Sequence, residues 1–336
     1  MNIHTIRTAA WCLGGLALLS QAHAAELKLP RDGWTSWQVD AVEGAPDMCC
    51  WSSWDDRDAS RKACRLDDDR GNWGSRDHAT ADTVRVYARM AGGKIERLRA
   101  LSATCPVETA TPIQELGSVA TDDSARWLTK LIKQDGTIST KRRDDGDDAL
   151  AALAMHRGDV AHNALAAIAR DDGGVETRKK AVFWLAHVRG VAGAEVATSV
   201  MFNDKDPELR QHAAFAITQS KSPRVAEDLI GLGNTDKDGE VRAQAWFWLA
   251  QTGAPVSEDA IVAALKKDND DQVREQAIFA LSQLPDERAT RALIAVAEDR
   301  SLSSEQRKRA VFWLAQSESK GAQLYLEKVL AGIVTD

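Results

Sequence analysis

Cysteine and histidine are the side chains of this 336-residue chain best suited to chemistry, and the cysteines are concentrated in its first third. Four of the five cysteines follow residue 24: Cys49, Cys50, Cys64 and Cys105. Four cysteines in an oxidising compartment predict two disulfides. A bond between the adjacent Cys49 and Cys50 is unfavourable, so we expect each to pair with one of Cys64 and Cys105. A zinc site is the alternative, although the spacing includes no C-x-x-C and no His pair.

Neither the histidines nor any common catalytic motif in the sequence indicates an enzyme. The sequence has no G-x-S-x-G, no H-E-x-x-H and no phosphate-binding loop. The acidic run 67–69, with Asp55, Asp56 and Asp58, could bind calcium, but it does not have the spacing of an EF-hand loop. A solvated acidic surface is the simpler interpretation. We therefore predict no catalytic residue, no metal and no cofactor.

A third set of residues is suited to binding. Five of the six phenylalanines recur at one position of a repeat: Phe183, Phe215, Phe247, Phe279 and Phe312. Four residues after each, on the same face of a helix, comes a polar side chain: His187, Gln219, Gln251, Gln283 or Gln316. Rings supply contact area and amides pair with peptide backbone, so the two rows predict a site for a protein or peptide partner. Alternatively, each ring packs sideways against the next unit; both hold if ring faces pack and ring edges stay exposed.

These rows belong to a repeat that occupies the last two thirds of the chain. Five similar blocks, such as TRKKAVFWLA and VRAQAWFWLA, are spaced by 32, 32, 32 and 33 residues, and each carries an arginine: Arg178, Arg210, Arg242, Arg274 and Arg307. One further step back reaches Gly146, which gives six units, the first without the arginine. A regular period of this kind is typical of a stacked repeat protein.

Each unit contains two apolar periodic stretches joined by turn residues. In the fourth unit we predict helices over 240–252 and 257–267, separated by a break at 253–255, with Ser257 as the second N-cap. One such hairpin cannot bury its apolar face alone, whereas stacked hairpins can. The sequence therefore predicts an α-solenoid of about six helical hairpins over 146–336.

The turns before the first helices carry a recognisable signature. Segments 206–210, 238–242 and 270–274 place an aspartate four residues before an arginine, and they resemble the D-x-x-V-R signature of HEAT repeats. The short period resembles the compact bilin-lyase-type unit, over roughly 146–333. This resemblance implies that the Asp and Arg columns form a ladder between units. It also implies that the first helix of each unit, with its Phe and Gln positions, lines the concave surface.

Known relatives of this architecture include enzymes. Those that hydroxylate protein lysines carry paired His-Glu motifs for a di-iron centre, and this sequence has no His-Glu dipeptide. Others attach bilins to pigment proteins, and the resemblance to them exists only at the level of the repeat.

One further column of the repeat alternates large and small residues: Ala152, Trp184, Ala216, Trp248, Ala280 and Trp313. On a helical projection, Trp248 falls on the apolar stripe with Val241 and Leu249, which we expect to face the partner helix. We interpret the column as core, with each indole filling the volume left by neighbouring alanines. A cofactor-stacking box is the alternative.

The segment 25–117 has a different composition. It is rich in tryptophan: Trp34, Trp37, Trp51, Trp54 and Trp73. Alternating residues over 84–101 about a Gly-Gly turn predict a β-hairpin. We predict a small disulfide-containing β or α+β domain, in which the tryptophans form either a core or a sugar-stacking platform. Residues 118–145 then supply a helix over 124–133, capped by Asp122 and Asp123, and a loop, which together shield the first unit.

The N-terminus and the charge bear on compartment and partners. Residues 1–24 have the pattern of a signal peptide: Arg7, an apolar stretch over 9–19, and Ala22-His23-Ala24. No stretch is long enough to span a membrane, so we expect an exported chain without membrane insertion, in the bacterial periplasm. A net charge of −7 argues against a nucleic-acid partner. The oligomeric state stays open.

The sequence as a whole favours a non-enzymatic exported HEAT-repeat scaffold that binds a protein or peptide on its concave face. A module that binds a ligand or cell-wall glycan through its Trp-rich domain is the first alternative. A bilin-lyase-like enzyme subunit is the second.

Overall fold

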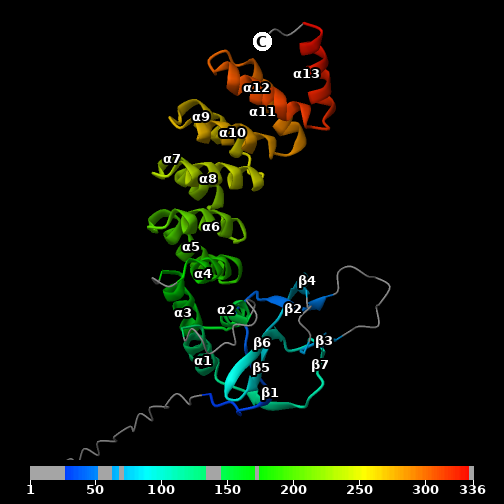
Figure 1. Ribbon diagram of the computed structural model, residues 1–336, viewed down its shortest axis with the longest axis vertical. Helices are drawn as coiled ribbons and strands as arrows, with labels where there is room; N and C mark the ends of the chain where they lie inside the picture. The colour runs from blue at the N-terminus through cyan, green and yellow to red at the C-terminus, as the bar shows by residue number, and fades with distance from the viewer. Residues whose placement is uncertain (1–26, 52–62, 68–71, 134–144, 171–173, 333–336) are drawn as a thin grey trace, which may run out of the picture.

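A computed structural model describes residues 27–51, 63–67, 72–133, 145–170 and 174–332. A small part built of strands lies at one end, and a long stack of helical hairpins extends from it (Figure 1). This is the mainly α solenoid, preceded by a disulfide-containing β region, that the sequence predicts. The predicted signal peptide, 1–24, lies outside the described residues. Within them, no helix is long and apolar enough to cross a bilayer.

The main sheet has four strands in the order β6-β5-β1-β8. Their bounds are β1 (Gly33–Asp40), β5 (Thr83–Ala91), β6 (Lys94–Ser102) and β8 (Ile113–Ser118). β5 is antiparallel to both β1 and β6, and β8 runs parallel to β1. The predicted hairpin is β5–β6, and its turn uses Gly92 and Gly93 at φ of 58° and 80°, a conformation that favours glycine.

Two small strand pairs complete this part of the chain. β2 (Pro46–Trp51) pairs with β4 (Asn72–Thr80), and β3 (Cys64–Arg65) pairs with β7 (Val107–Glu108). A disulfide joins Cys49 of β2 to Cys105, with 5.5 Å between their Cα atoms. It is one of the pairings that the spacing allowed. The sulfur of Cys64 lies 3.5 Å from that of Cys105, and the side chain of Cys50 lies outside the described residues.

Two of the five N-terminal tryptophans form core. Trp34 and Trp37 are each 1% exposed. The indole N–H of Trp34 donates to Asp67 Oδ1 at 3.0 Å, which gives this member of the acidic run a structural partner. The side chains of Trp51, Trp54 and Trp73, and the acidic residues 55–58 and 68–69, lie outside the described residues.

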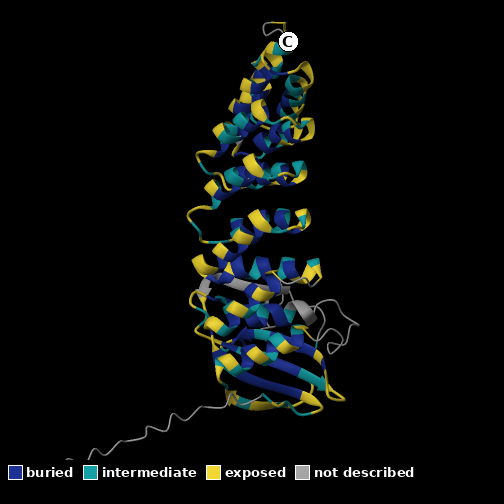
Figure 2. Ribbon diagram, turned by 90° about the vertical axis from the view of Figure 1, so that its left-hand side faces the viewer, coloured by how far each residue is buried: buried dark blue, intermediate teal, exposed yellow. Residues whose placement is uncertain are grey.

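Helix α1 (Thr121–Lys133) connects the sheet to the solenoid. It begins three residues before the predicted start, so Asp122 and Asp123 lie in its first turn, where acidic groups favour the positive end of the helix dipole. Its buried Ala125 and Leu128 belong to a core that runs without interruption from β1 and β5 into the first hairpins. Figure 2 shows the buried residues continuing from the sheet into the helical stack.

Six hairpins follow, as the repeat count predicts. They are α2 (Asp145–Met155) with α3 (Asp159–Arg170), α4 (Val175–Val188) with α5 (Gly190–Asn203), α6 (Pro207–Thr218) with α7 (Val225–Thr235), α8 (Gly239–Gln251) with α9 (Ser257–Lys267), α10 (Asp271–Ser282) with α11 (Asp286–Glu298), and α12 (Ser304–Ala315) with α13 (Lys320–Leu330). The even-numbered helices form one layer and the odd-numbered helices, from α3 on, form the other. Neighbours contact one another more extensively in the even-numbered layer, so this layer lies on the concave side.

The predicted boundaries of the fourth unit are correct to one residue, but the predicted cap is wrong. Val256 is the N-cap of α9, and it makes no side-chain capping bond. Ser257 is buried instead, and its hydroxyl donates to the carbonyl oxygen of Leu249 at 2.9 Å. The hydroxyl therefore ties α9 to the last turn of α8, at a carbonyl that also accepts from Thr252.

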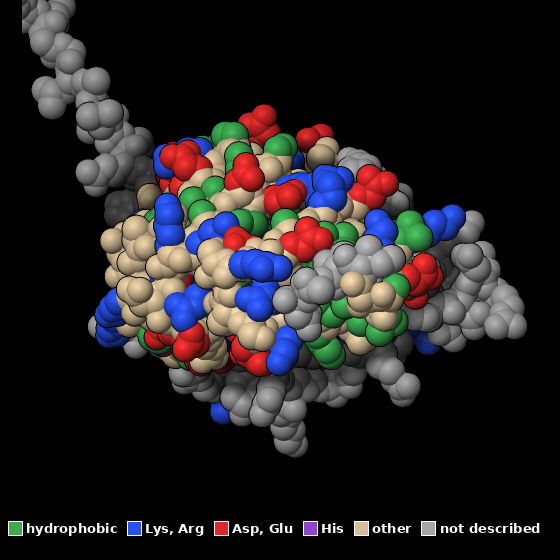
Figure 3. Space-filling model, turned by 90° about the horizontal axis from the view of Figure 1, so that it is seen from above, with side chains coloured by type: hydrophobic (Ala, Val, Ile, Leu, Met, Phe, Trp, Pro, Cys, Tyr) green, Lys and Arg blue, Asp and Glu red, His purple; other side chains and the backbone are tan. Residues whose placement is uncertain are grey.

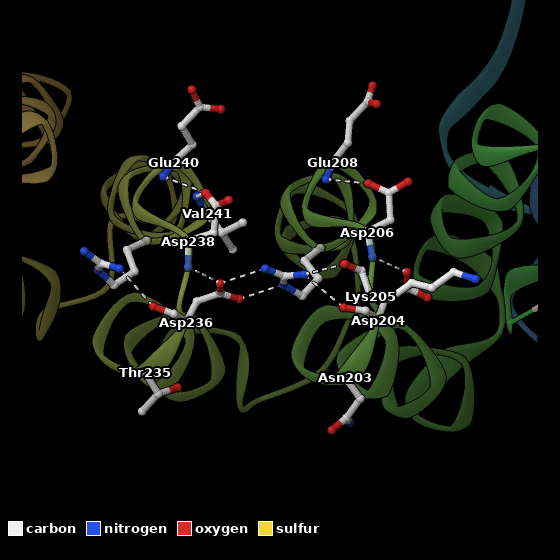
Figure 4. A network of polar contacts seen from close by, with 12 residues as sticks. Asn203, Asp204, Lys205, Asp206, Glu208, Thr235, Asp236, Asp238, Glu240 and Val241 are labelled. Carbon is white, nitrogen blue, oxygen red and sulfur yellow. Dashed lines mark hydrogen bonds and ion pairs between the residues drawn. The ribbon is translucent and has the colours of Figure 1, made fainter.

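The ladder implied by the HEAT resemblance is present, with a different carboxylate. Asp206, Asp238 and Asp270 of the signature are N-caps. Arg210 pairs with Asp236, at 2.7 Å from Nε to Oδ2, and its NH1 group also donates to the carbonyl of Asp204. Figure 4 shows how such contacts join two successive turns between units. Arg242 repeats them with Asp268 and the Asp236 carbonyl.

Candidate functional site

The predicted binding rows lie on the solvent-facing side of the even-numbered layer. On α8, Glu240, Gln244 and Gln251 are exposed and Phe247 is half-buried, at helical spacings that place all four on one face. Residues on the opposite face, such as Leu249, are fully buried in the core. Phe183, Phe215 and Phe279 are half-buried like Phe247, while Phe312, in the last unit, is 48% exposed.

The rings touch across the units and form a continuous line. Phe183 stacks on Phe215, with centroids 6.1 Å apart and an angle of 12° between the planes, and Phe247 stacks on Phe279 at 5.8 Å and 6°. Phe215 contacts Trp248 at 4.9 Å. The line continues from Phe279 to Trp313 at 5.0 Å and ends at Phe312. We call these rings the aromatic strip: Phe183, Trp184, Phe215, Phe247, Trp248, Phe279, Phe312 and Trp313.

The alternating Trp/Ala column is core at its alanines, as interpreted from the sequence, because Ala152, Ala216 and Ala280 are fully buried. Its indoles pack against this core and also belong to the strip. Trp184, Trp248 and Trp313 are half-buried. Where the column carries alanine, at Ala216 and Ala280, the phenylalanines of two units stack directly. At Trp248 and Trp313 the indole lies tilted against the phenylalanine of the preceding unit, and part of each ring stays open to solvent.

The indole that fills the core is Trp246, which the sequence analysis did not single out. It is 1% exposed, and a Cβ on Gly233 of α7 would come within 2.5 Å of its ring. Helix α8 packs extensively against α7 of the preceding unit and only lightly against its own partner α9. A single apolar stripe therefore underestimates its buried surface. Gly233, which leaves space for the Trp246 ring, was the feature of the sequence that could have indicated its burial.

The polar row accompanies the strip along the ends of the even-numbered helices. His187, Gln219, Gln251 and Gln316 are exposed and Gln283 is half-buried. Gln219, Gln283 and Gln316 are C-caps, and the amide of Gln251 donates to Gln283 Oε1 at 3.4 Å. The structure thus brings together every residue predicted for the site.

Two pockets open beside the strip at equivalent places. The first strip pocket has a volume of about 470 Å³ and is lined by Thr218, Gln219, Val225, Trp248, Gln251 and Thr252. The second strip pocket, of about 660 Å³, is lined by Ser282, Gln283, Ala289, Thr290, Leu293, Trp313, Gln316, Ser317, Glu318 and Ser319. The shared positions, such as Trp248 and Trp313 or Gln219 and Gln283, lie 65 or 64 residues apart, which is two units.

The electrostatic character of both pockets is set by helix ends. The pockets lie at the C-termini of α6 and α8 and of α10 and α12, where backbone carbonyls carry partial negative charge; Val225 at the N-terminus of α7 and Ser319, the N-cap of α13, also line them. Hydroxyls in the last turns donate back into the helices: Thr218 to the Phe215 carbonyl at 2.7 Å and Thr252 to that of Leu249 at 2.6 Å. No lysine or arginine lines either pocket, and Glu318 lines the second.

A buried serine–histidine pair lies where the sheet meets the solenoid. His156 Nε2 and Ser124 Oγ are 2.7 Å apart, His156 Nδ1 is 2.6 Å from the Ala152 carbonyl, and the Trp37 indole donates to Ser124. Burial lowers the pKa of His156 to about 4. Both side chains are completely buried, so they join β1, α1 and α2 and do not face a substrate.

The three described cysteines form a second cluster, with sulfur atoms within 4.8 Å of one another. Zinc binds thiolate sulfur. Because Cys49 and Cys105 are joined in a disulfide, they do not offer thiolates to a metal.

Comparison with known proteins identifies the class of the solenoid. Residues 162–247 and 234–315 match the HEAT repeat family. These residues are therefore HEAT repeats, as the D-x-x-V-R turns indicate. Among solved structures, the chain is similar to human deoxyhypusine hydroxylase in complex with glycerol, at 17% identity and a TM-score of 0.33, over 60% of this chain and 76% of that one. No curated protein sequence matches the chain significantly.

Proposed function

We propose that the protein is a non-enzymatic HEAT-repeat scaffold that binds an extended segment of a partner protein along the aromatic strip. The observation that carries this proposal is the continuity of the strip: rings from five successive units touch in one line on the solvent-facing side of the concave layer. A repeated surface suits a ligand that is itself repetitive, and a polypeptide backbone presents an N–H and a C=O at every residue.

The polar row supports the same proposal. Glutamine amides both donate and accept hydrogen bonds, so an exposed row of them can pair with an extended backbone. Aromatic rings beside this row supply apolar contact area at a low entropic cost, because each ring is already held by its neighbours. The groups best suited to chemistry have structural roles instead: His156 joins elements in the core, and Cys49 and Cys105 form a disulfide.

Export to the bacterial periplasm is part of this proposal. It rests on the signal-peptide pattern of residues 1–24 and is supported by the Cys49–Cys105 disulfide, because disulfides persist mainly in oxidising compartments. A glycan-binding role for the Trp-rich region loses support at Trp34 and Trp37, whose rings are buried in the core and offer no stacking platform.

Site-specific photocrosslinking in cells that naturally express the chain tests the proposal. A photoreactive residue at Gln244 and another at Gln276, both exposed on the strip side of successive units, should capture the same polypeptide. The matched control is Asp259, exposed on α9 in the other layer, which should capture none of it. Equal capture from Asp259, or capture of unrelated proteins from Gln244 and Gln276, would contradict the proposal.

A further inference from the structure

Resting on the proposed function, we infer that the two strip pockets are paired subsites that take two basic side chains, Lys or Arg, of one extended polypeptide. The two side chains are six residues apart. The aromatic strip would then hold the segment, and the pockets would set its register and its charge specificity.

The first argument is the two-unit period of the pockets. Units of this solenoid alternate between alanine and tryptophan in one column, and a strip pocket forms at Trp248 and again at Trp313, where the column carries the large residue. Equivalent glutamines flank both indoles: Gln219 and Gln251 in the first pocket, Gln283 and Gln316 in the second. A recurring set of lining residues indicates one kind of ligand group at both places.

The second argument is charge complementarity. Two helix C-termini and one helix N-terminus line each pocket, so the partially negative ends outnumber the positive one, and the amide oxygens of the glutamines are acceptors for a cation. The indole face attracts a cation through its quadrupole. Basic side chains are absent from both linings, and Glu318 adds a negative charge to the second. Arg288, the residue before Ala289 of the second lining, is held by the Gly253 and Ala254 carbonyls.

The third argument is that Trp184, the remaining tryptophan of the column, has different neighbours from Trp248 and Trp313. His187 stands beside Trp184, where Gln251 stands beside Trp248. Its imidazole stacks on Phe183 at 5.4 Å and lies 6.2 Å from the indole. Met155, buried in the core, occupies the position equivalent to Gln219. This unit therefore offers neither glutamine, and it provides a matched control within the same chain.

The spacing of the two basic side chains follows from the geometry of packed helices. Neighbouring helices lie about 8–10 Å apart, so two units separate the pockets by about 16–20 Å. An extended chain advances about 3.3 Å per residue. Five or six residues therefore cover the distance between the subsites. Because successive side chains of an extended chain point to opposite sides, a separation of six places both basic side chains on the side of the pockets.

Fluorescence anisotropy on the full chain with labelled 14-residue peptides tests the inference. Each peptide carries two lysines on a Gly/Ser/Ala background, at separations from two to nine residues, and a matched set carries two glutamates. We expect the lysine peptide with a separation of six to bind at least tenfold more tightly than those with two or three, and salt to weaken its binding. The glutamate peptides should not bind.

Variants that introduce a positive charge test whether the peptide binds in the pockets. Gln251→Lys and Gln316→Lys place a cation in each pocket at an exposed position, and each should weaken the best lysine peptide at least tenfold. His187→Lys, the matched control, should change it less than twofold. Lysine peptides that bind without a preferred separation, or an equal loss from His187→Lys, would overturn the inference. If no lysine peptide binds while the crosslinks from Gln244 and Gln276 persist, the paired subsites are wrong and the scaffold proposal stands.

Discussion

Each phenylalanine of the strip has a packed side and an open side, and its environment depends on whether another unit follows. Phe247 is packed between Trp248, at 4.9 Å, and Phe279, at 5.8 Å. Phe312 contacts only Trp313 among the described aromatic residues, and almost half of it is exposed. The same residue type at the same repeat position therefore contributes differently to stability.

We expect Phe247→Ala to lower the free energy of unfolding by about 2 kcal/mol, roughly half the cost of truncating a fully buried ring, because the stacked contact with Phe279 and the edge contact with Trp248 are lost. Phe312→Ala, the matched control, should cost less than about 1 kcal/mol. Urea denaturation followed by circular dichroism measures both. Equal costs for the two substitutions would show that the ring-to-ring contacts between units contribute nothing measurable.

His156 makes the stability of the molecule depend on pH. Burial lowers its pKa from 6.5 to about 4, so the unfolded chain binds a proton that the folded chain does not bind between these values. The contribution of His156 to the free energy of unfolding is fully present above pH 6.5 and falls as the pH is lowered toward 4. Between pH 7.5 and 4.5 this group alone accounts for a loss of about 2–3 kcal/mol.

The His156→Gln variant isolates this effect, because other titrating groups are common to both proteins. The free energy of unfolding, measured from denaturation curves at several pH values, should fall less in the variant as the pH is lowered. The difference should equal the loss assigned to His156. A parallel decline in the two proteins would mean that His156 is protonated in the folded state as readily as in the unfolded one.

The polar row and the phenylalanines were predictable because a 32-residue period makes equivalent positions visible. Whether a given aromatic side chain lies in the core or on the strip was harder to predict. Trp248 and Trp246 are two residues apart in one helix, yet the first faces the strip and the second the core against Gly233. A helical projection describes one buried face, whereas α8 packs against neighbours on several sides. The pockets were not predictable, since each depends on side chains from successive units.

At the scale of elements, the arginine ladder holds neighbouring hairpins in register. The D-x-x-V-R resemblance led to the arginines, but their carboxylate partners, Asp204, Asp236 and Asp268, lie two residues before the signature aspartate. The repeated D-x-D spacing was the available signal, because one aspartate caps the next helix while the other faces the guanidinium. Hydrogen bonds from Arg242 keep the pKa of Asp268 below its ordinary value despite partial burial.

We expect Arg210→Met to destabilise the protein by about 3–5 kcal/mol, because the Arg210 and Asp236 side chains are only 3% and 5% exposed and the carboxylate would be left buried without a cation. Arg274→Met should cost about 1 kcal/mol, since Arg274 pairs with the exposed Asp271. Urea denaturation measures both. The double variant Arg210→Met/Asp236→Leu should recover much of the loss, and a double variant as unstable as the single one would contradict this account.

At the scale of the whole molecule, the two ends of the solenoid are protected unequally. At the N-terminal end, α1 and the sheet share a continuous core with the first hairpins, and the Cys49–Cys105 disulfide closes a loop of 56 residues, worth about 4 kcal/mol by chain entropy. This shared core was not predictable, because it joins Trp37 to residues more than 80 positions later. At the C-terminal end, Leu324 and Leu330 are 58% and 87% exposed.

The ladder also ends before the last unit. The final repeat step is 33 residues instead of 32, and Asp299, the C-cap of α11, bonds to Lys266 at 2.7 Å and to Ser301. Arg274 consequently has no ion pair with the turn that follows α11 among the described contacts. The last hairpin, α12–α13, is therefore attached by packing and by the ion pair of Arg309 with Glu275 of α10, without a contact of the arginine ladder. Figure 3 views the molecule from this end, where apolar and charged side chains are interspersed on the surface.

Because stability in a solenoid is a sum of unit and interface contributions, we expect the molecule to open from its C-terminal end. Backbone amides of α12 and α13 should exchange with deuterium at least tenfold faster than those of α6 and α8, as measured by mass spectrometry on the full chain. Arg242→Met, which interrupts the ladder earlier, should extend the fast-exchanging region to α10 and α11, while Arg274→Met should leave its boundary in place. Uniform protection from α4 to α13 in the unmodified chain would mean that packing alone, and not the arginine ladder, sets the stability of each interface.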